Sequence, residues 1–200
     1  MDKGDTYYFI GIGGIGMSSI AKYLISKNFK VGGYDLTKTS ITNNLEKSGA
    51  QINYNDELKN IPILFKKESV IIIFTPAISK KNKQLNFFIN QGNPIYKRAE
   101  FLGFLTKNFQ TIAIAGTHGK TTTAAIVAHL FFKTKQSFTA FVGGVLNEFN
   151  SNVIIEGDRY AIVEADEYDR SFLNLSPKIG LITSIDSDHL DVYGNFDEVK

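Results

Sequence analysis

The sequence lacks several residue types and patterns whose absence narrows what the protein can be. It has no cysteine, no tryptophan and only 4 prolines in 200 residues. Without cysteine there are no disulfides and no thiolate metal ligands, as in proteins of a reducing compartment. No apolar run approaches the roughly 20 residues of a membrane span, and the first apolar run is too short and glycine-broken for a signal peptide. We therefore expect a soluble cytoplasmic protein without membrane insertion.

Charge gives no reason to expect a nucleic-acid partner. The 22 basic and 20 acidic residues leave a net charge of +2, and they form no basic stripe. With 43% hydrophobic residues, the chain can bury a sizeable core. Its length allows one large domain or two small ones.

Short β-branched or aromatic runs alternate with helical patterns along the chain, which is typical of α/β proteins. We expect strands at residues 6–10, 30–35, 51–54, 70–74, 95–97, 111–115, 138–142, 160–163 and 179–183, and helices at 17–28, 41–48, 82–90, 99–107 and 120–133. The pattern predicts a Rossmann-like doubly wound domain over residues 1–108. The first part of a P-loop-type α/β ATPase domain would follow over 109–200, truncated before its end.

The most informative segment follows the buried strand expected at 111–115. It reads Gly116, Thr117, His118, Gly119, Lys120, Thr121 and Thr122, and an apolar helical pattern comes next. Glycines let backbone N–H groups converge on an anion, and the helix N-terminus and Lys120 add positive charge. Thr121 is placed to offer its hydroxyl to a magnesium ion. The loop is shorter than the usual G-x-x-x-x-G-K-[ST] pattern, but its strand and helix context predicts a phosphate site.

A second glycine cluster follows the first expected strand. It contains G-x-G-x-x-G, and its glycines are Gly11, Gly13, Gly14 and Gly16. Asp35 ends the next strand, at about the ~20-residue spacing of a ribose-binding acid, although an aspartate there can equally cap a turn. The cluster predicts a bound nucleotide diphosphate without identifying the nucleotide.

Further polar residues stand where the expected strands end. Glu164 comes directly after one strand and is the best candidate ligand for Mg²⁺, which prefers oxygen ligands. His189 follows the last strand, where it could reach a metal or a phosphate or only tether the loop. Thr75 and Arg98 end strands of the first domain, on the rim where α/β sheets bind ligands.

In combination, these segments resemble the Mur ligase family of bacterial peptidoglycan synthesis. The matching segments lie at residues 11–18, 76–78, 98–102, 116–123, 164–167, 171–173 and 188–193. Met17 and Ser18, with the Ser-Phe-Leu segment at 171–173, favour the L-alanine-adding branch over the murein-recycling ligases. The resemblance extends over essentially the whole chain.

The resemblance implies ATP-dependent amide synthesis. The lactyl carboxylate of UDP-N-acetylmuramate would attack the γ-phosphate of ATP, and the amino group of L-alanine would attack the acyl phosphate. Lys120, Glu164 and His189 would be catalytic, with Thr121, Glu164 and His189 as metal ligands. ATP would bind the loop at 116–122. The UDP-sugar would contact Gly11, Gly13, Gly14, Gly16, Met17, Ser18, Asp35, Thr75 and Arg98.

The family's third domain has no counterpart in the 200 residues, so we expect weak UDP-sugar binding without turnover. Three alternatives stay open. A nicotinamide-dependent dehydrogenase would explain Gly11, Gly13, Gly16 and Asp35, but it leaves Lys120 without a role. A regulatory P-loop switch protein would need a base-reading motif, and a sensor of UDP-muramyl sugars would need no Lys120.

Overall fold

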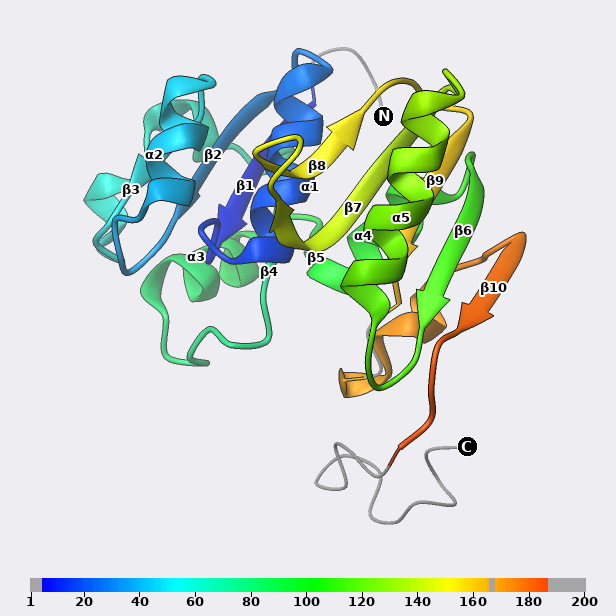
Figure 1. The fold of residues 1–200 in the computed structure, drawn as a ribbon. Helices are drawn as coiled ribbons and strands as arrows, with labels where there is room; N and C mark the ends of the chain where they lie inside the picture. The colour runs from blue at the N-terminus through cyan, green and yellow to red at the C-terminus, as the bar shows by residue number, and fades with distance from the viewer. Residues whose placement is uncertain (1–4, 166–167, 187–200) are drawn as a thin grey trace. The chain divides into compact units, whose positions relative to one another are not determined.

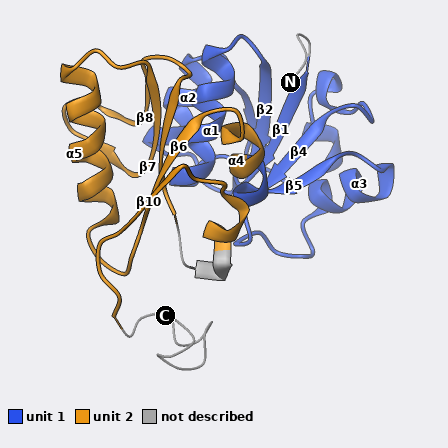
Figure 2. Cartoon of the chain, turned by 90° about the vertical axis from the view of Figure 1, so that its right-hand side faces the viewer, with its two compact units in different colours: residues 1–101 blue, residues 102–200 orange. Residues whose placement is uncertain are grey.

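The structure is a computed structural model that describes residues 5–165 and 168–186. The chain folds into two compact units, Met1–Phe101 and Leu102–Lys200 (Figure 2). Each unit contains a five-stranded sheet. Within the described ranges, none of the helices combines the length and apolar character that crossing a membrane requires.

The first unit has a wholly parallel sheet with the strand order β3-β2-β1-β4-β5 (Figure 1). Its strands are β1 (Thr6–Ile10), β2 (Lys30–Tyr34), β3 (Gln51–Asn53), β4 (Ile71–Phe74) and β5 (Ile95–Lys97). Its helices are α1 (Ile15–Ser26), α2 (Ser40–Lys47) and α3 (Lys83–Gln91), with short 3₁₀ turns η1 (Leu58–Asn60) and η2 (Ile63–Phe65). α4 (Arg98–Thr106) begins in this unit and ends in the next. The predicted doubly wound fold is confirmed.

Neighbouring residues of β1 pack on opposite faces of the first sheet, because side chains alternate along a strand. Tyr7 packs edge-to-face on Phe101 of α4, with ring centroids 5.7 Å apart. Tyr8 contacts Phe65 of η2 and Phe88 of α3, each at 5.3 Å. Both faces are therefore covered, which explains why β1 and β4 are apolar at nearly every position.

The Tyr8 hydroxyl belongs to a buried polar network. It donates to Gln84 Oε1 at 2.8 Å and accepts from Asn53 Nδ2 at 2.5 Å. Gln84 Nε2 closes the ring by donating to Asn53 Oδ1 at 2.9 Å. Burial raises the pKa of Tyr8 well above its ordinary value, and the hydrogen bond from Asn53 offsets only part of this shift. The network joins β1, β3 and α3.

The second unit has the strand order β10-β6-β9-β7-β8, with β8 antiparallel and the other strands parallel. Its strands are β6 (Gln110–Ala115), β7 (Phe138–Leu146), β8 (Ser151–Ile155), β9 (Tyr160–Glu164) and β10 (Ile179–Ile182). α5 (Lys120–Lys133) lies along one face of this sheet (Figure 1), and η3 (Tyr168–Asn174) precedes β10. Three apolar residues of β10 are exposed: Ile179, Leu181 and Ile182.

The structure departs from the expected elements at three places. α1 begins at Ile15 inside the glycine cluster, with Gly14 as its N-cap, rather than at residue 17. β7 continues through Gly143 and Gly144 to Leu146, with an irregularity after Phe141, whereas this strand was predicted to end at residue 142. β8 was not expected at all. Glycines inside a strand often mark a bulge rather than an end.

The strand order of each sheet predicts where a ligand would bind, at the carboxyl ends of its central strands. In the first sheet the chain adds β2 and β3 on one side of β1 and then β4 and β5 on the other. Parallel α/β sheets bind ligands at the carboxyl ends of the strands where the strand order reverses in this way. In the second sheet, β6 lies between β9 and β10. The carboxyl ends of β1 and β6 are where the two predicted loops begin.

Candidate functional site: two anion-binding loops

The first loop runs from β1 into α1 across the end of β2. Gly11 adopts φ +87°, a left-handed conformation that favours glycine. The N–H groups of Gly11 and Ile12 both donate to the carbonyl of Tyr34, at 2.8 and 3.1 Å. The loop therefore turns back tightly and presents the N-terminus of α1, whose first N–H groups have no acceptor within the helix. This geometry suits a diphosphate.

Three predicted site residues lie against three of the glycines. They are Thr75 beside Gly11, Asp35 beside Gly13 and Arg98 beside Gly16. A β-carbon added to these glycines would lie 2.6, 2.8 and 2.5 Å from the nearest side-chain atom, respectively. Glycine is therefore needed at each position for this close approach. The structure brings together side chains from the ends of β2, β4 and β5, as strand order predicts.

Asp35 is engaged with backbone of its own unit. One carboxylate oxygen accepts from Gly13 N at 2.7 Å, and the other accepts from Thr37 N at 3.1 Å. Asp35 thereby fixes the glycine loop against the end of β2, which is the turn-capping role that the sequence left open. A ribose hydroxyl would have to share a carboxylate that already accepts two hydrogen bonds. Contact between Asp35 and a nucleotide stays a prediction.

Gly14 is the N-cap of α1, and Met17 and Ser18 follow in the first turn of this helix. Met17 is 1% exposed and Ser18 is fully buried. Ser18 Oγ donates to the carbonyl of Ile15 at 2.9 Å. The N–H of Ser18 donates to the carbonyl of Gly14 at 2.8 Å. Contact between these two residues and a ligand stays a prediction.

The second loop connects β6 to α5, where the sequence predicts a phosphate site. Gly116 has φ +124° and Gly119 has φ +82°. Gly119 is the N-cap of α5, and because glycine has no side chain, it leaves the first N–H groups of this helix open to an anion. Thr122 is exposed in the first turn of α5. The predicted strand, loop and helix follow one another as expected.

Lys120 is held above its own loop. Its Nζ donates to the carbonyl of Gly116 at 2.5 Å and to that of Thr117 at 3.4 Å. These carbonyls hold the ammonium over the loop rather than letting it extend into solvent. The positive charge therefore stands next to the helix N-terminus, where both favour an anion.

Thr121 and Glu164 meet beside the phosphate loop. Thr121 Oγ1 donates to Glu164 Oε2 at 3.0 Å, and the other carboxylate oxygen accepts from Gly143 N at 2.8 Å. Mg²⁺ takes oxygen ligands, and it usually combines one or two protein groups with phosphate oxygens and water. A hydroxyl and a carboxylate at this spacing fit that ion. The described residues contain no group of three or more His, Cys, Asp or Glu side chains that could hold a metal ion. A magnesium ion here would therefore depend on phosphate oxygens and water for its other ligands.

Residues at the end of β10 also shape the phosphate loop, a role that the sequence pattern did not predict. Thr183 Oγ1 donates to the carbonyls of Ala115 and His118 at 3.1 and 2.5 Å. Ser184 accepts from Thr117 N through its carbonyl at 2.9 Å and from His118 N through Oγ at 3.1 Å. The available signal was hydroxyl residues directly after a strand, but only the pairing of β10 with β6 reveals their target.

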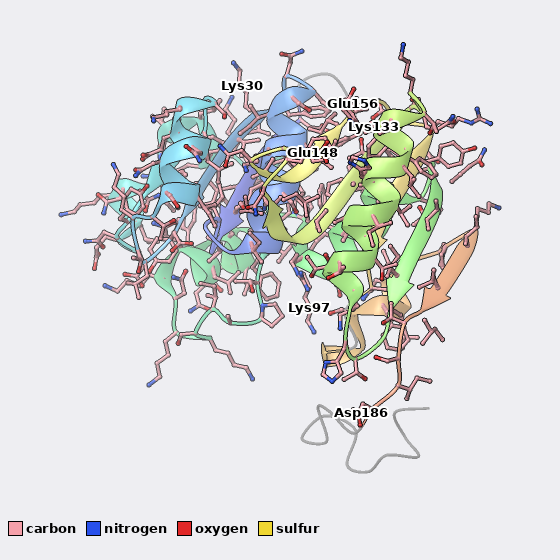
Figure 3. All side chains as sticks on the ribbon, in the orientation of Figure 1. Lys30, Lys97, Lys133, Glu148, Glu156 and Asp186 are labelled. Carbon is pink, nitrogen blue, oxygen red and sulfur yellow. The ribbon has the colours of Figure 1, made fainter. Side chains whose placement is uncertain are left out.

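The remaining predicted residues lie at the rim or outside the described ranges. The side chain of His118 is 71% exposed, and its Nε2 is 3.8 Å from Asp186 Oδ2. Asp186, labelled in Figure 3, lies just beyond β10, and its N–H donates to Thr117 Oγ1 at 3.0 Å. His189 lies outside the described residues, so its role as metal ligand or catalytic group stays a prediction.

Two glycine loops on separate α/β sheets, the second with Lys120, Thr121 and Glu164, are typical of nucleotide-binding enzymes. Residues 6–110 match the model of the Mur ligase family, catalytic domain, and residues 114–200 match the Mur ligase middle domain. The chain belongs to the Mur ligase family, which confirms the resemblance.

Individual relatives narrow the comparison. The chain is 48% identical, over 97% of its length, to the UDP-N-acetylmuramate–L-alanine ligase of Christiangramia forsetii. It is 46% identical, over 98% of its length, to that of Flavobacterium johnsoniae. It spans 43% and 44% of these two relatives, respectively.

Solved structures agree with the fold. The UDP-N-acetylmuramate-alanine ligase of Thermotoga maritima superposes with a TM-score of 0.86 at 31% identity, over 97% of this chain and 45% of that one. The Neisseria meningitides UDP-N-acetylmuramate:L-alanyl-γ-D-glutamyl-meso-diaminopimelate ligase reaches a TM-score of 0.87 at 21% identity, over 98% and 65%. At that lower identity the second likeness speaks for the fold alone.

Proposed function

We propose that the protein supplies the UDP-sugar and ATP sites of a UDP-N-acetylmuramate–L-alanine ligase in peptidoglycan precursor synthesis. The main support is the 48% identity to such a ligase over 97% of the chain, a range that includes both glycine loops. The local geometry agrees, because each loop opens a helix N-terminus toward the ligand edge of its sheet.

The proposed reaction needs activation because a carboxylate is a poor acylating agent at neutral pH. An oxygen of the lactyl carboxylate attacks the γ-phosphorus of ATP, and ADP leaves. The amino nitrogen of L-alanine then attacks the acyl carbon, phosphate leaves, and the nitrogen loses a proton. Such transfers depend mostly on positioning and on neutralising phosphate charge.

The second loop has groups suited to that task. We assign the β- and γ-phosphates to Lys120 and to the first N–H groups of α5. Thr121 and Glu164 would hold Mg²⁺, which when bound neutralises charge on the phosphate oxygens. Gly143 N keeps Glu164 oriented by occupying its other oxygen. His189 would act near the transferred group, as the family resemblance implies.

The first loop has groups suited to the UDP-sugar. The N-terminus of α1 would receive the diphosphate, and Arg98, which packs against Gly16, would add a full positive charge there. Thr75, whose methyl group faces Gly11, would contribute its hydroxyl. Asp35 would support the loop rather than read the nucleotide.

Two alternative functions have weaker support than the L-alanine ligase. A dehydrogenase would use Asp35 for the ribose of a nicotinamide cofactor, but both carboxylate oxygens of Asp35 already accept backbone hydrogen bonds. A murein-recycling ligase would have the same fold, but the curated relatives at 41–48% identity are L-alanine ligases.

Two measurements test the proposal. Calorimetric titration of the chain should show binding of UDP-N-acetylmuramate and of ATP with Mg²⁺, and no binding of NADH. A polypeptide extended to the length of the relatives should release phosphate with L-alanine but not with D-glutamate. Binding of NADH in place of UDP-N-acetylmuramate would refute the assignment of the first loop. Phosphate release that ignores the amino acid would refute the ligase assignment.

A further inference from the structure

We infer that Thr183 and Ser184 are positioning residues for ATP. They would hold the phosphate loop in the conformation that presents Lys120 and the N-terminus of α5 to the triphosphate. The inference rests on the proposed function of this loop, and it adds two residues to which neither the motif nor the metal site assigns a role.

The register of the sheet explains why these residues reach the loop. Ile182 of β10 pairs with Ala115 of β6, so the next residues of both strands leave the sheet side by side. Thr183 N donates to the carbonyl of Ala115 at 3.0 Å, which extends the ladder by one step. A β-carbon on Gly116 would lie 2.3 Å from Thr183 Oγ1. Gly116 therefore allows Thr183 to lie directly against the loop.

Thr183 holds carbonyls on both sides of the turn. Its hydroxyl has a single hydrogen, which is shared between the carbonyl of Ala115 and the nearer carbonyl of His118. A carbonyl oxygen that turned toward the ligand would repel phosphate. By engaging the carbonyl of His118, one residue before the N-cap of α5, Thr183 keeps negative partial charge away from the helix N-terminus.

Ser184 engages two amides of the loop. Its carbonyl accepts from Thr117 N and its hydroxyl oxygen accepts from His118 N. These two N–H groups therefore point toward β10. An anion would then be bound by the amides of the first turn of α5, where Lys120 also stands. The division of donors explains how a loop shorter than the usual pattern can still form one focused anion site.

A matched set of hydroxyl substitutions tests this role. Thr183→Val removes the hydroxyl and keeps the branched shape, and Thr183→Ser keeps the hydroxyl. Thr139→Val is the control, because Thr139 is a buried threonine of the same sheet whose hydroxyl donates to the carbonyl of Gly157 at 2.8 Å. Affinity for ATP with Mg²⁺ is measured by calorimetry, and unfolding is followed by circular dichroism.

We expect Thr183→Val to weaken ATP binding about tenfold, the effect of one or two lost hydrogen bonds. Thr183→Ser should restore most of the affinity, and Thr139→Val should bind like the wild type even if its melting temperature falls. If Thr183→Val does not fold, Ser184→Ala replaces it, with an expected loss of about threefold and faster hydrogen exchange at the amide of His118.

The outcomes separate this inference from the proposed function. If the wild type binds ATP and Lys120→Ala does not, while Thr183→Val binds like the wild type, the positioning role is wrong and the ATP site stands. If Thr183→Ser loses as much affinity as Thr183→Val, the hydroxyl is not the cause and the inference fails. If the wild type itself does not bind ATP with Mg²⁺, the proposed function fails first.

Discussion

A methyl group at Gly143 would collide with the carboxylate of Glu164. The added β-carbon would lie 2.7 Å from Oε2, so the carboxylate would have to retreat by about 0.7 Å to reach an ordinary contact of 3.4 Å. That movement would lengthen the 3.0 Å hydrogen bond from Thr121 and disturb the pair proposed to hold Mg²⁺. Gly143 is not among the residues with positive φ, so alanine causes no backbone strain.

We therefore expect Gly143→Ala to weaken binding of ATP with Mg²⁺ about tenfold. A hydrogen bond to a charged group contributes about 1.5–3 kcal/mol. Because this site is partly exposed, we take the lower end, about 1.5 kcal/mol, which is about a factor of ten. The free energy of unfolding should change by less than about 0.5 kcal/mol, as for most surface substitutions. Calorimetric titration and urea unfolding measure the two quantities.

Gly180→Ala is the matched control, because no atom lies within 4 Å of the added β-carbon and Gly180 is in the same sheet. Titration with ATP in EDTA adds a second control, since the difference between Gly143→Ala and wild type should then vanish. Equal affinity of Gly143→Ala and Gly180→Ala for ATP with Mg²⁺ would refute the assignment of Glu164 to the metal.

Three further predictions follow from the two loops and from the buried tyrosine. Lys120→Ala should lower ATP affinity about thirtyfold, or about 2 kcal/mol, and leave calorimetric binding of UDP-N-acetylmuramate unchanged. Gly16→Ala should lower affinity for UDP-N-acetylmuramate about tenfold, because the new β-carbon would displace the guanidinium of Arg98, 2.5 Å away, while helix stability is kept or slightly raised. Tyr8→Phe should lower the free energy of unfolding by about 1–3 kcal/mol at neutral pH, since buried partners lose their hydrogen bonds.

Tyr8 also predicts a pH dependence. Its folded pKa is raised above the ordinary 10.0 by burial, so its stabilising contribution is complete below pH 10.0 and is lost as pH rises toward the folded value. Tyr8→Phe should therefore lose stability less steeply than the wild type above pH 10.0, and parallel alkaline unfolding curves would contradict this.

For Lys120→Ala the control is Lys133→Ala on the same helix (Figure 3). A loss of UDP-sugar binding in Lys120→Ala would contradict the proposal that the two loops bind separate ligands.

Much of the fold could be predicted because apolar runs and glycine turns are local signals. The strands on either side of the two loops were located to within a residue or two, and so were α2, α3 and α4. β8 was missed because Ser151 and Asn152 give it a polar start, and its three apolar residues are too few to show a period. β7 was predicted too short because Gly143 and Gly144 resemble a strand end when the neighbouring strand is unknown.

The residues of the candidate site also divide into those that a local sequence signal identifies and those that depend on neighbouring strands. The glycines, Lys120 and Thr121 lie in one continuous motif, so the sequence identifies them directly. Gly143 and Thr183 act through partners at Glu164 and His118, which lie 21 and 65 residues away in the chain. Their roles depend on strand order and register, which the sequence pattern does not specify. For Asp35 the sequence left a ligand contact and a turn cap open; the structure shows the backbone hydrogen bonds of a cap, and the ligand contact stays a prediction.

The exposed apolar strand β10 has a practical consequence for anyone who handles this polypeptide. Ile179 and Ile182 are 56% and 65% exposed, and β10 lies at the end of the strand order among the described residues. β10 pairs with β6 along one edge, and among the described residues no strand pairs with its other edge. An exposed apolar edge strand is a template for self-association. Every titration should therefore be accompanied by a light-scattering check of monodispersity, and a lysine at position 182 offers a way to keep the sample soluble while the loop residues stay intact.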